Sequence, residues 1–180
     1  MRYFIICSIS LLLFTACNND RLPVYGIKTY GTKVVKGKEV QDSIDYTVPG
    51  FSLIDQDSNS INQATTAGKI YVADFFFTSC PSICPPMKRQ MLRIYDKYQN
   101  NNEVLLLSYS IDPKRDTVQK LRKYADKLGI TNTEKWHFLT GNKDSIYSLA
   151  ESYLVSAAED PDAPGGHVHD GNFILIDKQR

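Results

Sequence analysis

The chain has 180 residues, of which 42% are hydrophobic and 23% are charged, and its formal net charge is +1. That length accommodates one domain with a hydrophobic core, together with a tether. The near-neutral charge balance argues against nucleic acid or a strongly acidic protein as a partner.

The first residues have the pattern of a secretory signal. Arg2 precedes an apolar run from Tyr3 to Ala16, which ends at Cys17 and gives way to polar residues. This run is too short for a transmembrane helix, which needs about 20 residues, and small residues precede its end, as at a signal cleavage site. The segment FTAC resembles a bacterial lipobox, so we predict a lipoprotein-type signal peptide over 1–17 and lipidation of Cys17. The alternative is a signal anchor with an incidental cysteine.

Either interpretation places the domain on the extracytoplasmic side of a bacterial membrane and limits which cysteines can act there. Cys7 is removed with the signal and Cys17 carries the lipid, so Cys80 and Cys84 remain as one close pair. In an oxidising compartment such a pair is able to form a disulfide.

After Cys17, we expect a tether and N-terminal extension over residues 18–46, and the main domain follows over 47–180. Within this domain the apolar patterns and turn residues predict alternating strands and helices. In order, we expect a hairpin over 51–63, a buried strand over 69–78, a helix over 87–98, a strand over 103–111, a helix over 117–129 capped by Asp116, a strand over 136–140, a helix over 143–153, a loop over 159–166 and a strand over 172–177.

This order predicts an α/β fold with a parallel central pair of strands and right-handed crossovers. The cysteine pair directly follows the first buried strand, which is where thioredoxin-like folds carry their redox site. We therefore expect a three-layer thioredoxin-like domain with an N-terminal hairpin extension. Such folds normally finish with another strand and helix, which we expect to be missing here because the sequence ends three residues after Asp177.

The motif FTSCPSICPP sets the geometry of the cysteine pair. Pro85 and Pro86 are tolerated only in the first turn of a helix, so Cys84 belongs at the helix start and Cys80 in the preceding loop. A helix start favours thiolate over thiol. On a turn, the two sulfurs are able to converge on a disulfide or on one soft metal ion such as Cu(I) or Zn. A purely structural disulfide is a third interpretation.

Three histidines are available as further ligands. His137 lies in an apolar strand, where a histidine is more often a core residue than a ligand. His167 and His169 precede the last strand, and their i, i+2 spacing places both on one face if the backbone is extended there. Either is a potential third donor beside the dithiol.

Four ordered blocks of the sequence resemble the Sco/SenC family, which comprises copper-handling proteins for cytochrome c oxidase assembly. They extend over about residues 45–177 and read VADFFFTSCPSICPPM (72–87), SYSIDPKRDT (108–117), WHFLTG (136–141) and HDGNFILID (169–177). The resemblance implies a copper site made by Cys80, Cys84 and His169, with the cysteines also able to cycle through a disulfide. Asp112, Arg115 and Asp116 belong to the second block, and we interpret them as structural. Met87 is interpreted as a core methionine.

The resemblance implies an extracytoplasmic copper metallochaperone, a binding protein and not an enzyme. Its expected partner is subunit II of cytochrome c oxidase, which carries the copper A site, or another copper or thiol protein. The alternative is a thiol–disulfide oxidoreductase, with Cys80 and Cys84 as its catalytic redox pair. The sequence leaves open which role dominates, which membrane carries the lipid anchor, and whether His167 also binds the metal.

Overall fold

The computed structural model describes residues 22–180, and the chain divides into two compact units between Tyr46 and Thr47. The predicted signal peptide and Cys17 lie outside the described residues. Within 22–180, no helix combines the length and the apolar character that crossing a membrane requires.

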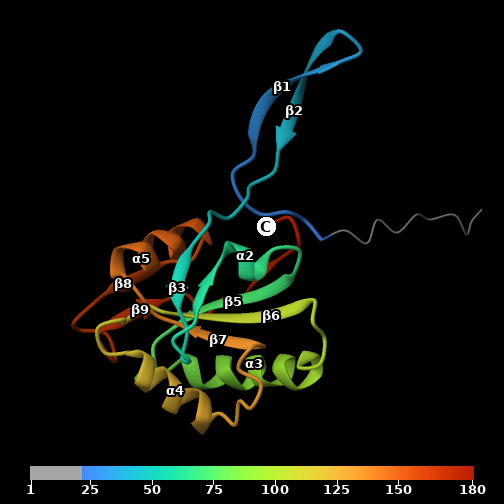
Figure 1. Cartoon of the computed structure of the whole chain (residues 1–180). Coiled ribbons are helices and arrows are strands. Elements are labelled where there is room, and N and C mark those ends of the chain that lie inside the picture. Colours follow the sequence, from blue (N-terminus) through green and yellow to red (C-terminus); the bar gives the residue numbers. More distant parts are fainter. Residues whose placement is uncertain (1–21) are drawn as a thin grey trace, which may run out of the picture. The chain divides into compact units, whose positions relative to one another are not determined.

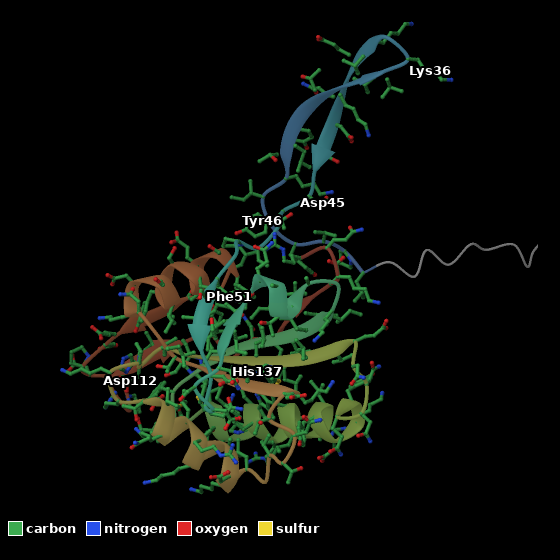
Figure 2. The ribbon with its side chains drawn as sticks, in the orientation of Figure 1. Lys36, Asp45, Tyr46, Phe51, Asp112 and His137 are labelled. Carbon is green, nitrogen blue, oxygen red and sulfur yellow. The ribbon has the colours of Figure 1, made fainter. Side chains whose placement is uncertain are left out.

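The first unit is a β-hairpin of strands β1 (Thr29–Val35) and β2 (Lys38–Ile44). Its two-residue turn, Lys36–Gly37, has positive φ at both positions, +51° and +76°. Turns of this kind match the right-handed twist of the paired strands. Figure 2 marks Lys36 at the tip and Asp45 at the base. We predicted an N-terminal hairpin extension without placing its strands, for which the Lys-Gly dipeptide between weakly alternating segments was a usable signal.

The second unit is built around a four-stranded sheet in the order β10-β5-β6-β7 (Figure 1). The parallel strands are β5 (Ile70–Phe76), β6 (Val104–Ser110) and β7 (Trp136–Leu139). Strand β10 (Ile174–Ile176) pairs antiparallel with β5. The predicted buried strands are therefore confirmed, and β6 is buried from Leu105 onward because helices cover both faces of the sheet.

Helices α3 (Cys84–Tyr98) and α4 (Val118–Lys127) cover one face of the sheet, and α5 (Lys143–Ser152) covers the other (Figure 1). Adjacent residues of β5 point to opposite faces. Phe76 packs against Tyr124 of α4, whereas Phe75 stacks on Tyr109 and contacts Tyr153 at the end of α5. This three-layer arrangement is the predicted thioredoxin-like fold.

Two small hairpins complete the unit. The predicted one consists of β3 (Ser52–Ile54) and β4 (Ser60–Asn62), and a short helix α2 (Gln63–Thr66) follows it. The other pairs β8 (Ala157–Glu159) with β9 (His167–His169), on either side of the predicted loop. His167 and His169 thus belong to a separate strand that precedes β10.

One prediction about a helix cap is wrong. The N-cap of α4 is Thr117, whose hydroxyl accepts a hydrogen bond from the N–H of Lys120. Asp116 is fully buried instead, and its carboxylate accepts hydrogen bonds from Thr78 and Ser110. A buried carboxylate with these donors is more strongly held than one at a solvent-exposed cap.

Candidate metal centre

The cysteine pair occupies the turn between β5 and α3, as the two prolines predict. Cys84 is the first residue of α3, and Ile83 precedes it as the N-cap. Cys80 lies in the loop, where its N–H donates to the carbonyl of Phe77 over 3.2 Å. Both cysteines are free thiols, 9% and 2% exposed respectively.

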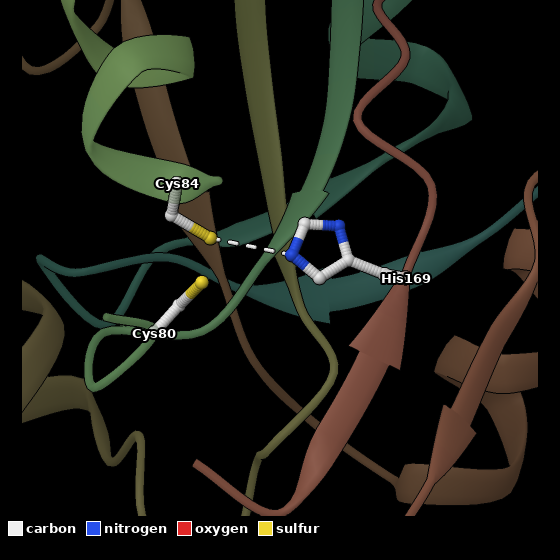
Figure 3. Close-up of side chains that lie close together, drawn as sticks. All are labelled: Cys80, Cys84 and His169. Carbon is white, nitrogen blue, oxygen red and sulfur yellow. Dashed lines mark hydrogen bonds between the residues drawn. The ribbon is translucent and has the colours of Figure 1, made fainter. Parts of the chain in front are cut away.

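His169 approaches this turn from β9 (Figure 3). Its Nε2 lies 3.3 Å from the sulfur of Cys84, and its Nδ1 is 2.9 Å from the backbone carbonyl of Asp170. Because that carbonyl is only an acceptor, Nδ1 carries the proton and Nε2 presents its lone pair to the sulfurs. Metal-binding histidines are typically oriented in this way by a backbone carbonyl.

Cys80, Cys84 and His169 form one potential metal-binding group. Their Sγ atoms and one ring nitrogen all lie within 4.8 Å of one another. Among residues 22–180, this is the one group of three or more histidine, cysteine or acidic side chains that converges in this way. A site of two thiolates and one imidazole suits Cu(I), Cu(II) or Zn better than a hard cation such as Mg²⁺.

The two thiols differ in acidity. Burial alone would raise the pKa of Cys80, but hydrogen bonds from the Cys84 thiol, from the N–H groups of Cys84 and Ser82 and from the Ser82 hydroxyl together lower it. Burial, reinforced by the hydrogen bond to Cys80, raises the pKa of Cys84 to about 12. The expected preference for thiolate is therefore found at Cys80, which accepts hydrogen bonds from Cys84 at the helix start and from Ser82. At Cys84, the first residue of the helix, desolvation dominates.

Burial also lowers the pKa of His169 below its ordinary value, although the hydrogen bond to the Asp170 carbonyl opposes this effect. A low pKa keeps the imidazole neutral at pH 7, and a metal binds the neutral form.

The other two histidines lie elsewhere. His137 is buried in β7, with its Nδ1 2.9 Å from the carboxylate of Asp55, so it is the satisfied core residue we predicted (Figure 2). Nδ1 of His167 lies 3.2 Å from Arg115 Nη2. A guanidinium only donates, so this nitrogen accepts a hydrogen bond from Arg115. The ring of Phe77 contacts both histidines of β9, with ring centroids 5.2 Å apart for His167 and 6.0 Å apart for His169.

A buried ion pair lies behind the cysteine turn. Lys88, one helical turn after Cys84, donates to Asp74 of β5 over 2.7 Å and to Ser108 over 3.0 Å, and its ammonium is 4.0 Å from the centre of the Phe76 ring. We did not predict this pair. Its signals were an aspartate inside an otherwise apolar strand and a lysine on the apolar face of α3, since such charges are rarely buried unpaired. Met87 is buried, as expected of a core methionine.

An open groove adjoins the site on the side of α5. It has a volume of about 810 Å³, and His169 forms part of its wall. Its apolar lining comes mainly from the end of α5 and from the β8–β9 hairpin, and includes Leu154, Val155 and Val168. Of the three converging residues, His169 lines this groove and the two cysteines do not.

The SCO1/SenC family profile matches residues 40–180. A SCO1 protein homolog of Bacillus subtilis is 30% identical over 142 residues, which span 78% of this chain and 73% of that protein. A SCO2-like protein of Rickettsia typhi is 31% identical over 126 residues, 69% of this chain. The match covers 58% of the Rickettsia protein, less than two thirds of its length.

Solved structures with the same fold include proteins described as copper-bound. Arabidopsis thaliana ScoI with copper bound is 31% identical, with a TM-score of 0.60, and the match covers 73% of this chain and 81% of that one. A SCO1/SenC family lipoprotein of Bacillus anthracis is 26% identical, with a TM-score of 0.67 and coverages of 74% and 80%. BsSco, described as having a disulfide switch and as a member of the Sco family of cytochrome c oxidase assembly proteins, is 29% identical, with a TM-score of 0.64 and coverages of 74% and 78%.

Proposed function

The chain belongs to the SCO1/SenC family, and from this premise we propose that it is a copper metallochaperone for the assembly of cytochrome c oxidase. The observation that carries the proposal is the convergence of Cys80, Cys84 and His169, with their donor atoms within 4.8 Å of one another. Support comes from relatives described as copper-bound and from one described as a cytochrome c oxidase assembly protein.

In this proposal copper is cargo, and the protein supplies donors that hold it and then release it. The thiolates of Cys80 and Cys84 select a soft ion, and Nε2 of His169 adds a neutral third ligand. Loading displaces the thiol protons, so binding depends on pH. The proposed recipient is the copper A site of oxidase subunit II, whose own donors replace these three in turn. The groove that His169 lines is the approach that we propose for such a partner.

The test is a Cu(I) titration of the reduced chain against a competing chelator. We expect about one copper per chain, loss of binding in Cys80→Ser and Cys84→Ser, and weaker binding in His169→Ala. His137→Gln is the matched control, because His137 contacts Asp55 and lies outside the group of three donors. Equal affinities in the wild type and His169→Ala would exclude His169 as a ligand.

The proposal includes a membrane anchor. Lipidation of Cys17, which lies outside the described residues, would hold the domain at the extracytoplasmic face of a bacterial membrane. The relative from Bacillus anthracis is described as a lipoprotein, which supports this part. Detection of a lipid-modified N-terminal cysteine in the mature chain by mass spectrometry tests it, and an unmodified Cys17 in the mature chain would contradict it.

The unequal acidity of the two cysteines favours a second function, thiol–disulfide exchange. Cys80, with its lowered pKa, has the character of an attacking thiol, and the buried Cys84 that of a resolving one. In this reaction the thiolate of Cys80 attacks a partner disulfide and one partner sulfur leaves as a thiol. Cys84 then displaces the second sulfur, so the partner ends reduced and Cys80–Cys84 oxidised. If the reduced chain does not bind copper but rapidly reduces a test disulfide, thiol–disulfide exchange is favoured over copper delivery.

A further inference from the structure

The segment from Ser110 to Asp116 makes hydrogen bonds to both parts of the chain that carry the metal donors. These parts are the loop that leads to Cys80 and the strand β9 that carries His169. The segment leaves the carboxyl end of β6, and Figure 2 marks Asp112 on it. Two backbone hydrogen bonds to the Asp112 carbonyl close it into a tight turn, 3.1 Å from the N–H of Arg115 and 2.8 Å from that of Asp116. The segment therefore forms a closed turn at the carboxyl end of β6, and Asp116 at its end bonds to Thr78 of the loop that leads to Cys80.

Asp116 holds the cysteine side. Its carboxylate is fully buried and accepts hydrogen bonds from the N–H of Thr78, over 2.9 Å, and from the Thr78 hydroxyl. The hydroxyl of Ser110 donates to the same carboxylate over 2.7 Å, and the ammonium of Lys120 lies 3.2 Å away. Thr78 is two residues before Cys80, so this carboxylate fixes the start of the loop that carries the first sulfur.

Arg115 holds the histidine side. Its Nε donates to the carboxylate of Asp112, which orients the guanidinium. Its Nη2 then donates to the carbonyl of Gly165 over 2.6 Å and to Nδ1 of His167 over 3.2 Å. These contacts are made to the start of β9, and His169 is at the end of this three-residue strand. Consecutive residues, Arg115 and Asp116, thus hold the nitrogen-bearing and sulfur-bearing parts of the site.

We propose that Arg115 and Asp116 are positioning residues that set the relative placement of His169 and the cysteine pair. Their side-chain hydrogen bonds go to neighbours of the three donors: those of Asp116 to Thr78 and Ser110, and those of Arg115 to Asp112, Gly165 and His167. The two sides are separable: loss of Arg115 loosens the approach of the nitrogen, and loss of the Asp116–Thr78 bonds loosens the sulfur-bearing loop. Residues that hydrogen-bond directly to metal ligands typically contribute 10–100-fold to affinity. The contacts of Arg115 and Asp116 are one step more remote, so we expect effects at the lower end of this range. This inference rests on the proposed copper binding.

The test compares variants of each side by copper affinity and by the spectrum of the Cu(II) form. Arg115→Met is expected to weaken copper binding about tenfold and to reduce the nitrogen hyperfine coupling seen by electron paramagnetic resonance, in the same direction as expected for His169→Ala. Thr78→Val is expected to weaken binding by a similar factor, to keep the nitrogen coupling and to shift the thiolate-to-copper absorption. Thr78→Ser keeps the hydroxyl and is expected to restore the wild-type spectrum.

Asp55→Asn separates positioning from general destabilisation. Asp55 is also fully buried, and its carboxylate accepts hydrogen bonds from Asp57, Asn59 and His137. Replacing this carboxylate by an amide should destabilise the fold while leaving the spectrum of bound Cu(II) unchanged. The inference is overturned if Arg115→Met and Thr78→Val bind copper with wild-type affinity and spectra, or if Asp55→Asn alters them equally. A wild-type chain that binds no copper would instead overturn the proposed function, and the inference with it.

Discussion

Replacing Lys88 by methionine is expected to destabilise the domain severely, because it removes one partner of a buried ion pair. The Lys88 side chain is 3% exposed and that of Asp74 is fully buried. Lys88→Met leaves the Asp74 carboxylate without its cation, and it also removes the hydrogen bond to Ser108 and the contact with the Phe76 ring. Breaking a buried pair on one side costs about 3–5 kcal/mol, a large share of the roughly 5–15 kcal/mol that a domain typically has.

The assay is urea unfolding followed by the fluorescence of Trp136, the one tryptophan of the chain. Trp136 is fully buried, and its indole N–H donates to Ser108 over 2.9 Å, so it reports on the same network. Adding Asp74→Asn to Lys88→Met removes the unpaired charge and should recover stability, with a coupling energy of about 2 kcal/mol. The exposed Lys97→Met is the control and should change stability by less than about 0.5 kcal/mol. A cost below about 1 kcal/mol for Lys88→Met, or no recovery in the double variant, would refute the reasoning.

Three further predictions concern the metal-free protein. Limited alkylation with iodoacetamide at pH 7, mapped by mass spectrometry, should modify Cys80 before Cys84, because only Cys80 has a lowered pKa; preferential labelling of Cys84 would contradict this. Gly165→Ala should cost about 1–3 kcal/mol in urea unfolding, since Gly165 has φ of +88° and an added Cβ would lie 2.6 Å from the Phe77 ring; a neutral substitution would show that the ring yields. Because burial lowers the pKa of His169, the unfolded chain takes up this proton more readily below pH 6.5. Stability should therefore fall as the pH drops from 6.5 toward the folded pKa, and by less in His169→Asn; equal slopes in the two proteins would argue against the buried neutral imidazole.

The sequence alone was sufficient for the parts of the fold that depend on local signals. The buried strands were predicted from their apolar runs, and the position of Cys84 at a helix start followed from Pro85 and Pro86. The assignment of His169 over His167 came from the family resemblance, and the structure places only His169 in the group of three donors.

The remaining features depend on contacts between distant segments. Asp116 has the sequence pattern of a helix cap, yet Thr117 makes the cap, because Asp116 binds Thr78, 38 residues away in the chain. The contact between Arg115 and His167 spans 52 residues and leaves no periodic trace in the sequence. Which hydrogen-bond partner a buried polar side chain has depends on which residues the fold brings close to it, and local sequence patterns do not record this.

X-ray absorption at the copper edge, on the reduced chain loaded with one equivalent of Cu(I), tests the central claim most directly. If Cys80, Cys84 and His169 together bind copper, the metal is coordinated by two sulfurs and one nitrogen. The nitrogen should then be lost in His169→Ala, and one sulfur in Cys80→Ser or Cys84→Ser. The account would be contradicted if a weak chelator removed all the copper from the chain, or if the bound copper had no sulfur ligand.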